Sequence, residues 1–120
     1  QNLELVAVCD RNFESTGKFD DGIYFYPDYN DLLDHGIDAL FVCLTNDVAA
    51  EVTIAGLNSE MHVFCEKPLG TNLNECLKIK KLVNSQKDLI FMLGFMRRYD
   101  PGIELAGCRG NRFSRKNAPL

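Results

Sequence analysis

Val63-Phe64-Cys65-Glu66-Lys67-Pro68-Leu69 decides the fold, because its apolar start predicts a strand and Pro68 locks the backbone where that strand ends. Glu66 and Lys67 therefore fall at the tip of the predicted strand. In open α/β sheets, ligands bind in the crevice beyond the carboxyl ends of the strands. The stretch thus predicts that Lys67 lies at the mouth of a binding cleft. The alternative is that these residues only end a strand and begin a turn.

Apolar runs and helical spacing on both sides of this stretch predict an alternation of strands and helices. The predicted strands are residues 3–9, 23–26, 39–44, 62–65 and 89–95, and the run at 39–44 predicts a strand buried on both faces. The predicted helices are a short one that Asp28 caps and Gly36 ends, one over 47–58 capped by Asn46 or Asp47, and one over 73–83 capped by Thr71 or Asn72. This order predicts an α/β fold with a parallel sheet wound by crossover helices.

The composition of the 120 residues, 46% hydrophobic and 25% charged, is that of a soluble globular domain. A net charge of −4 disfavours a nucleic-acid partner, which normally requires a positive surface. The five cysteines form no CxxC pair and indicate a reducing compartment, and the two histidines lack a ligand at zinc spacing, so no metal is expected. No apolar run approaches about 20 residues and no signal peptide is evident, which predicts a cytoplasmic protein without a membrane partner.

Asp10 follows the first predicted strand, where a Rossmann-type domain places the carboxylate that binds the adenosine ribose. A carboxylate there repels a 2′-phosphate, which favours NAD as the cofactor. Arg11 can instead hold that phosphate, which leaves NADP as an alternative. An aspartate after a strand is also a common turn residue.

Two further loops follow predicted strands. Leu44-Thr45-Asn46-Asp47 leads into a helix whose free N–H groups can face a phosphate, although helix capping explains Asn46 and Asp47 equally well. Met96-Arg97-Arg98-Tyr99-Asp100 brings two guanidinium groups to the edge of the sheet that carries Lys67. Such donors can hold a polyhydroxyl or anionic substrate, and pairing with Asp100 is the alternative.

Six segments resemble, in this order, the glucose–fructose oxidoreductase, inositol dehydrogenase and MocA family: LVAVCDRN, DYNDLL, IDALFVCLTND, AEVTIAGL, HVFCEKPLGTN and GFMRRYDPG. The similarity runs from residue 3 to about residue 105, and the pairing of EKP with GFMRRYD is most similar to the inositol 2-dehydrogenase branch. The resemblance implies an oxidoreductase that transfers a hydride between a secondary alcohol of a cyclitol or sugar and a nicotinamide cofactor, NAD or NADP. It also implies a partial Rossmann-type sheet, a small polyol or sugar as the substrate, and a homo-oligomeric complete protein.

The resemblance also assigns roles to individual residues. Lys67 is the implied catalytic residue, which hydrogen-bonds the reacting hydroxyl group. The Lys67–Pro68 bond is a candidate for the cis geometry. The residues implied to bind the cofactor are Asp10, Arg11, Leu44, Thr45, Asn46, Glu66 and Lys67, and those implied to line the substrate pocket are Met96 and Arg97.

The chain also departs from the family pattern. No G-x-G-x-x-G precedes the strand at 3–9, Thr45 stands where the family has proline, and Ala49 stands where it has histidine. We expect a partial dinucleotide-binding domain over 1–106, a divergent basic tail over 107–120, and no second, substrate domain. Because the absent strand is central in the order 3-2-1-4-5-6, its two neighbours are expected to lose a hydrogen-bonding partner.

Two readings of the whole chain follow from these patterns. The first is an enzyme fragment that is inactive by itself. The alternative is a non-catalytic truncated Rossmann-like module with a regulatory or interaction role, which the substitutions at Thr45 and Ala49 and the basic tail motivate.

Overall fold

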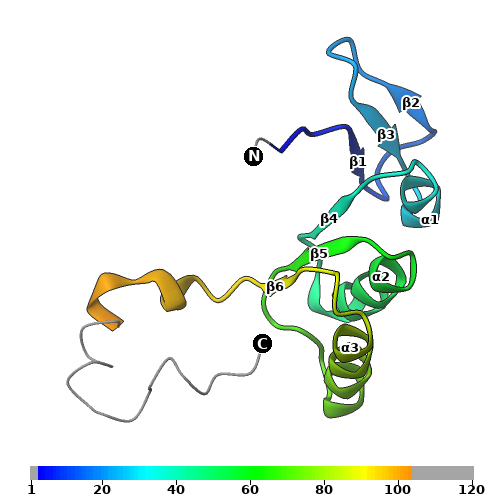
Figure 1. Ribbon diagram of the computed structural model, residues 1–120. Coiled ribbons are helices and arrows are strands. Elements are labelled where there is room, and N and C mark those ends of the chain that lie inside the picture. Colours follow the sequence, from blue (N-terminus) through cyan, green and yellow to red (C-terminus); the bar gives the residue numbers. More distant parts are fainter. Residues whose placement is uncertain (1–2, 104–120) are drawn as a thin grey trace.

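We describe residues 3–103 from a computed structural model, and the predicted tail at 107–120 lies outside the described residues. The chain begins with three successive strands, and from the third of them onward strands and helices alternate, as the sequence predicts (Figure 1). Most strands are shorter than predicted. The elements are β1 (Ala7–Cys9), β2 (Gly17–Lys18), β3 (Tyr24–Tyr26), α1 (Tyr29–Leu33), β4 (Ala39–Val42), α2 (Asn46–Asn58), β5 (His62–Cys65), α3 (Leu73–Ser85), β6 (Phe91–Leu93) and the 3₁₀ helix η1 (Met96–Tyr99). Within residues 3–103, no helix has both the length and the apolar character needed to cross a bilayer.

The described strands form two sheets. One has the order β4-β5-β6 and is entirely parallel, which confirms the prediction of crossover connections. The other has the order β1-β3-β2, with β1 parallel and β2 antiparallel to β3. The sequence patterns did not predict β2, because its two residues are too few to show a period.

β1 and β4 are each an edge strand of their sheet, and no strand pairing joins the two sheets within the described residues. We call this lack of pairing the break between β1 and β4; these are the two strands that were expected to lose a hydrogen-bonding partner. Side-chain packing still links the two halves, since Ala7 and Cys9 of β1 pack against the main hydrophobic core. The Tyr29 hydroxyl of α1 also donates to Oε1 of Glu51 in α2 at 2.7 Å.

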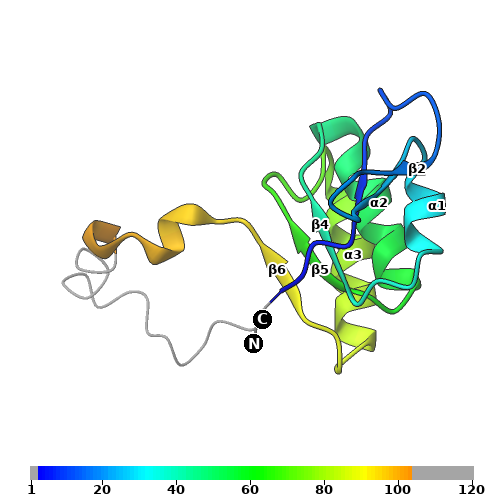
Figure 2. The ribbon, with the colours of Figure 1, turned by 90° about the horizontal axis from the view of Figure 1, so that it is seen from above.

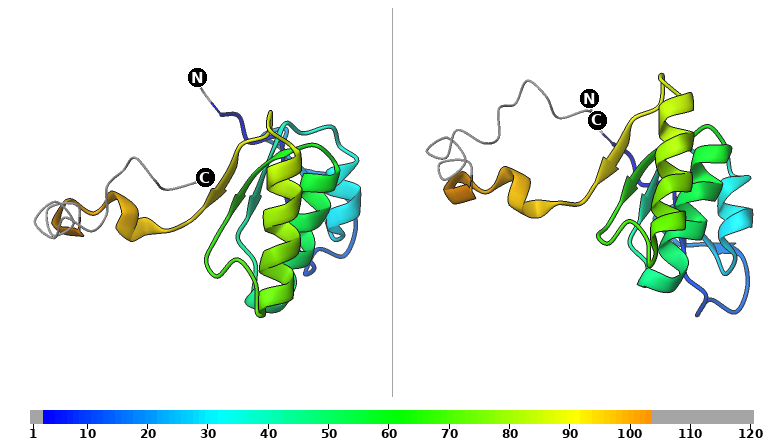
Figure 3. Two further views of the ribbon diagram at one scale, coloured as in Figure 1. Left: turned by 60° about the horizontal axis from the view of Figure 1, so that its bottom comes forward. Right: turned by 90° about the horizontal axis from the view of Figure 1, so that it is seen from below.

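Helices α2 and α3 cover one face of the β4-β5-β6 sheet (Figure 3). Strand side chains that point to these helices are buried, and Leu57 of α2 and Ile79 of α3 are 0% exposed between the layers. Phe41 of β4 points to the opposite face and is 56% exposed. The prediction that residues 39–44 are buried on both faces is therefore wrong, because no described helix covers the face that carries Phe41.

The helix ends agree with the sequence patterns in two cases of three. Asp28 caps α1 and accepts a hydrogen bond from the Asn30 backbone N–H at 2.8 Å, and Gly36 follows with a φ of 81°. For α2, however, the cap is Thr45, so the prediction of Asn46 or Asp47 is wrong. The helix begins one residue earlier than predicted, which places Asp47 in its first turn, where a negative charge is favourable.

The start of α3 is fixed by a network of two side chains. The Asn72 side chain accepts from the Glu75 backbone N–H at 3.1 Å, which confirms Asn72 as the cap. Glu75 reaches back and accepts from the Thr71 backbone N–H at 2.7 Å. This last bond is the main reason that the pKa of Glu75 lies below its ordinary value. The arrangement follows the logic of a capping box, in which two side chains satisfy the free N–H groups of the first turn.

Replacing Asn72 with alanine is expected to destabilise α3 by about 1 kcal/mol, because a free N–H group loses its acceptor. Amide hydrogen exchange along α3 measures the loss. Asn74→Ala is the matched control, since Asn74 is an exposed asparagine of the same first turn. Equal loss of protection in both variants would contradict the assignment.

The lowered pKa of Glu75 also predicts a pH dependence. The charged carboxylate stabilises the fold above the ordinary carboxyl pKa of about 4.5, and this contribution is lost as the pH falls through the lower pKa of the folded state. In Glu75→Gln, the amide protection of α3 is therefore expected to fall less steeply as the pH drops below about 4.5. A loss of protection as steep as that of the unmodified chain would refute this role.

Candidate functional site

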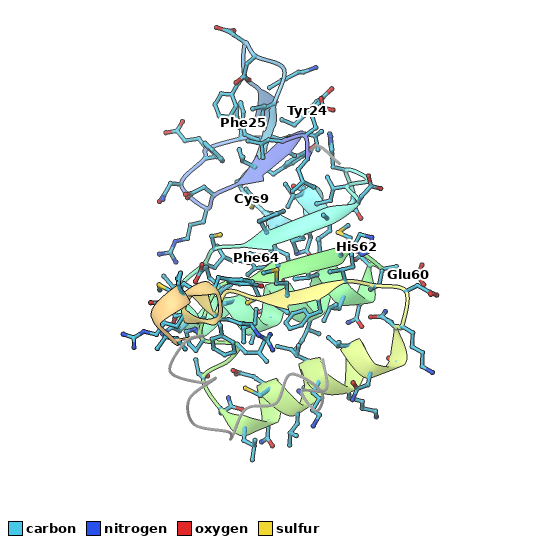
Figure 4. All side chains as sticks on the ribbon, turned by 60° about the vertical axis from the view of Figure 1, so that its left-hand side comes forward. Cys9, Tyr24, Phe25, Glu60, His62 and Phe64 are labelled. Atoms are coloured by element: carbon cyan, nitrogen blue, oxygen red, sulfur yellow. The ribbon has the colours of Figure 1, made fainter. Side chains whose placement is uncertain are left out.

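The carboxyl ends of β4, β5 and β6 lie at one level of the sheet. The Glu66 backbone N–H donates to the Val42 carbonyl at 2.9 Å, and the Gly94 N–H donates to the Cys65 carbonyl at 2.8 Å. The loops that follow the three strands therefore leave the sheet side by side. In Figure 4, Cys9 of β1 and Phe64 of β5 also lie toward the side that carries η1, and His62 lies toward the other. We call this side the carboxyl edge; its candidate residues are Asp10, Arg11, Leu44, Thr45, Asn46, Glu66, Lys67, Met96 and Arg97.

Lys67 lies two residues after the end of β5, the central strand of the β4-β5-β6 sheet. Its side chain is exposed, whereas that of Glu66 is half-buried. The Lys67 backbone N–H donates to Oε2 of Glu66 at 3.1 Å, and the Lys67–Pro68 bond is cis, as predicted. Cys65 beneath them is 0% exposed, and burial raises the pKa of its thiol. A buried thiol with a raised pKa is a poor nucleophile, so the polar chemistry available at this point belongs to Glu66 and Lys67.

Asp10 and Arg11 follow β1 and are both exposed. Oδ1 of Asp10 accepts from the Asn12 backbone N–H at 2.9 Å, which confirms that Asp10 shapes a turn. A carboxylate has about four acceptor sites, so this bond leaves capacity for a ligand hydroxyl. The turn interpretation and the ribose interpretation are therefore compatible.

The loop after β4 places Leu44, Thr45 and Asn46 at the start of α2, all exposed. Thr45 makes no side-chain capping bond to the first turn of the helix. The pKa of Asp47 is lowered, mainly by a hydrogen bond with the Thr45 side chain and also by the positive charge of Arg11.

Met96 and Arg97 belong to η1, which begins three residues after β6. Met96 is 72% exposed, Arg97 is also exposed, and the segment extends away from the sheets (Figure 2). Asp100 accepts from the backbone N–H groups of Gly102 at 2.7 Å and Ile103 at 3.3 Å. The Asp100 carboxylate therefore caps the following turn. The described structure starts η1 at the carboxyl edge but does not pack Met96 or Arg97 against the sheet.

The donor and acceptor groups of the carboxyl edge fit a dinucleotide. Asp10 offers an exposed carboxylate for ribose hydroxyls, and α2 offers a first turn without a side-chain cap for a phosphate or amide. A glycine-rich turn for the pyrophosphate is not present within residues 3–103. The same residues contain no cluster of three His, Cys, Asp or Glu side chains that could hold a metal ion.

Gly94 is part of the carboxyl edge although no sequence pattern predicted it. A Cβ atom at this position would lie 3.0 Å from Oε1 of Glu66. A glycine two residues before Met96 was visible in the sequence, but only the pairing of β5 with β6 shows which side chain it faces.

Sequence comparison finds relatives that carry inositol dehydrogenase names. The chain is 34% identical over 105 residues to the inositol 2-dehydrogenase of Salmonella typhimurium (strain LT2), covering 83% of this chain and 31% of the relative. It is 37% identical over 107 residues to the inositol 2-dehydrogenase/D-chiro-inositol 3-dehydrogenase of Lacticaseibacillus casei, covering 83% and 30%. The chain thus spans about a third of the length of these curated relatives.

Solved structures that share the fold of this chain also carry inositol dehydrogenase names. The crystal structure of myo-inositol dehydrogenase from Lactobacillus casei with NAD(H) and myo-inositol matches with a TM-score of 0.75 and 29% identity, over 88% of this chain and 33% of that one. Myo-inositol 2-dehydrogenase from Lactobacillus plantarum matches with a TM-score of 0.73 and 33% identity, over 92% and 35%. The GFO/IDH/MocA oxidoreductase family, described by its NAD-binding Rossmann fold, matches residues 1–95. The chain therefore belongs to the GFO/IDH/MocA family of oxidoreductases with an NAD-binding Rossmann fold.

Proposed function

We propose that the chain is part of a dehydrogenase that transfers a hydride between a secondary alcohol of a cyclitol or sugar and the nicotinamide of NAD. The main support is that the carboxyl ends of β4, β5 and β6 lie at one level of the sheet. The segments that carry Asn46, Lys67 and Arg97 therefore leave the sheet on the same side. The inositol dehydrogenase relatives support a cyclitol as the substrate class.

Each part of the carboxyl edge would hold a different part of the reacting complex. Asp10 binds the adenosine ribose, with Arg11 beside it as the group that would accept the 2′-phosphate of NADP. Leu44, Thr45 and Asn46 line the cofactor cleft at the start of α2. Glu66 and Lys67 lie beside the nicotinamide, and the side chains that contact the substrate are Met96 and Arg97.

The proposed reaction removes a hydride from the carbinol carbon and a proton from its hydroxyl group, so that a ketone forms. The cofactor, when bound, supplies the hydride acceptor. Lys67 hydrogen-bonds the substrate oxygen and stabilises the negative charge that develops on it, while the hydroxyl proton passes to a base of the separate substrate domain. A rigid support suits this role, because the buried Val63 and Cys65 fix the backbone of β5 just before Lys67.

The chain would act within a larger protein. We propose a partial dinucleotide-binding domain over 1–106, a divergent basic tail over 107–120, a separate substrate domain elsewhere, and a homo-oligomeric enzyme. We place the enzyme in the cytoplasm, since the cysteines of residues 3–103 are free thiols, which suit a reducing compartment.

The direct test is the activity of the full-length protein with NAD or NADP and a panel of cyclitols and sugars. Reduction of the nicotinamide is followed by its absorbance. We expect turnover with at least one cyclitol and a preference for NAD. An intact, folded full-length protein that reduces neither cofactor with any polyol of the panel would refute the proposal.

Asp10→Ala is expected to weaken NADH binding by the full-length protein by about 10- to 150-fold, since charge-assisted hydrogen bonds contribute about 1.5–3 kcal/mol. Asp21→Ala is a matched control: Asp21 shapes the same type of turn by accepting from the Ile23 backbone N–H at 3.1 Å, but it lies in the β2–β3 hairpin. Nicotinamide fluorescence gives both affinities. Equal losses in the two variants would show that Asp10 acts only on the fold.

A second candidate is a non-catalytic module that retains part of the fold for a regulatory or interaction role. The break between β1 and β4 favours it, because the cofactor cleft would lie across that break. A titration of the 120-residue chain with NADH tests whether the chain by itself retains a cofactor site. Binding at ordinary dinucleotide strength would exclude the non-catalytic reading, whereas no binding is expected for either a fragment or a module. Activity of the full-length protein then separates those two.

A further inference from the structure

Gly94 lies against the carboxylate of Glu66 at the carboxyl edge. A Cβ atom on Gly94 would lie 3.0 Å from Oε1, 3.1 Å from Cδ and 3.2 Å from Oε2 of Glu66. These distances are shorter than usual contacts of a Cβ atom, so an alanine would force the carboxylate to move. The carboxylate thus occupies the space that the missing side chain of Gly94 leaves free.

The backbone conformation does not explain this glycine. Among the glycines of residues 3–103, only Gly22 and Gly36 have a positive φ, so Gly94 has a conformation that other residues can adopt. Core packing does not explain it either. At Gly17 and Gly56 a Cβ atom would meet the buried or half-buried side chains of Phe25 and Leu40, whereas at Gly94 the three nearest atoms all belong to one carboxylate group.

The position of this carboxylate matters because it is bonded to Lys67. Oε2 of Glu66 accepts from the Lys67 backbone N–H at 3.1 Å. The Gly94 N–H in turn donates to the Cys65 carbonyl at 2.8 Å, which fixes Gly94 beside the residue that precedes Glu66. Gly94, Glu66 and Lys67 therefore form one connected unit at the ends of β5 and β6.

We propose that Gly94 is a positioning residue, which keeps the Glu66 carboxylate in place beside Lys67 and the nicotinamide site. The proposal rests on the proposed function for its effect on the cofactor. Its structural part, the control of Glu66 by Gly94, is independent of that function. A displacement of a few tenths of an ångström costs little stability, because the carboxylate is the end of a flexible side chain, but a reactive site is sensitive to such shifts.

The structural part is tested by NMR on the full-length protein. The Lys67 amide proton is expected to report the pH titration of the Glu66 carboxylate through the bond at 3.1 Å. In Gly94→Ala this titration response is expected to shrink at least about twofold, because a hydrogen bond weakens steeply as it lengthens and bends. An unchanged response of the Lys67 amide in Gly94→Ala would overturn the proposal.

Gly70→Ala provides a matched control. A Cβ atom on Gly70 would lie 2.9 Å from Oε2 of Glu75, which accepts from the Thr71 backbone N–H at 2.7 Å. This variant also crowds a glutamate that binds a backbone amide, but at the start of α3. It should change the response of the Thr71 amide and leave that of Lys67 unaltered. A similar loss at Lys67 in both variants would mean a general disturbance and would overturn the proposal.

The functional part is tested in the full-length enzyme by a double-mutant cycle. Gly94→Ala is expected to lower kcat/KM for NAD by about three- to tenfold, with a smaller change in thermal stability than Gly70→Ala causes. In a Glu66→Ala background, adding Gly94→Ala should change kcat/KM less than about twofold, because the side chain that it displaces is gone. Additive losses would show that Gly94 acts by another route.

The two tests separate the inference from the proposed function. A full-length protein without any dehydrogenase activity would refute the function and the cofactor role of Gly94 together, while the amide titration would still decide whether Gly94 positions Glu66. An active enzyme with additive losses in the cycle would refute the inference alone.

Discussion

Lys67→Ala in the full-length enzyme is expected to lower kcat for cyclitol oxidation by about 10²–10⁴-fold, the usual contribution of a positioned acid–base group. Lys67 is an exposed lysine two residues after the end of β5, next to the half-buried Glu66. KM for NAD should change much less than kcat, because the proposed contact of Lys67 is with the reacting oxygen rather than with the adenosine half of the cofactor. Steady-state kinetics with NAD and the best cyclitol of the panel measure both constants.

Lys80→Ala is the matched control for this experiment. Lys80 is also an exposed lysine, but it lies on α3, away from the carboxyl edge. Its removal should leave kcat within about twofold, since surface charges away from a site contribute little. If Lys67→Ala oxidises the cyclitol at the unmodified rate, Lys67 has no catalytic role and the proposed mechanism is wrong.

The second large effect concerns stability: the 120-residue chain by itself is expected to melt broadly and to aggregate. β1 and β4 each end a sheet, so their outer backbone groups lack strand partners within the described residues. A backbone group that is buried there without a partner would cost about 1–3 kcal/mol, and a whole domain is stable by only about 5–15 kcal/mol. The burial of only a few such groups would therefore remove most of the stability.

Calorimetry and hydrogen exchange measure this prediction. The amides of β1 and β3 should exchange faster than those of β5, because β5 contributes the buried Val63 and Cys65 to the core, whereas no residue of β1 or β3 is buried. Edge strands also favour association with other chains, so the loss of soluble material on heating should increase with concentration. A reversible, cooperative transition of the isolated chain, with similar protection in both sheets, would contradict the prediction.

The Glu66-Lys67-Pro68 stretch shows how far local patterns reach at the site. The apolar run before it, the polar pair and the proline were enough to predict a strand, its end and a candidate for a cis bond, because these features depend on neighbours in the sequence. For the same reason the sequence narrowed the cap of α3 to Thr71 or Asn72, of which the structure selects Asn72. At α2 the same reasoning chose Asn46 or Asp47 over Thr45, because three successive residues can all cap a helix.

Local patterns alone determined that this protein alternates strands with helices and that Lys67 follows a buried strand. Only the tertiary structure decided three other features: the exposure of Phe41, the break between β1 and β4, and the contact of Gly94 with Glu66. The physical reason is that hydrophobic period and capping act over a few residues. The covering of a sheet face and the space left beside a carboxylate depend instead on which distant strands pair, and Gly94 lies 28 residues after Glu66.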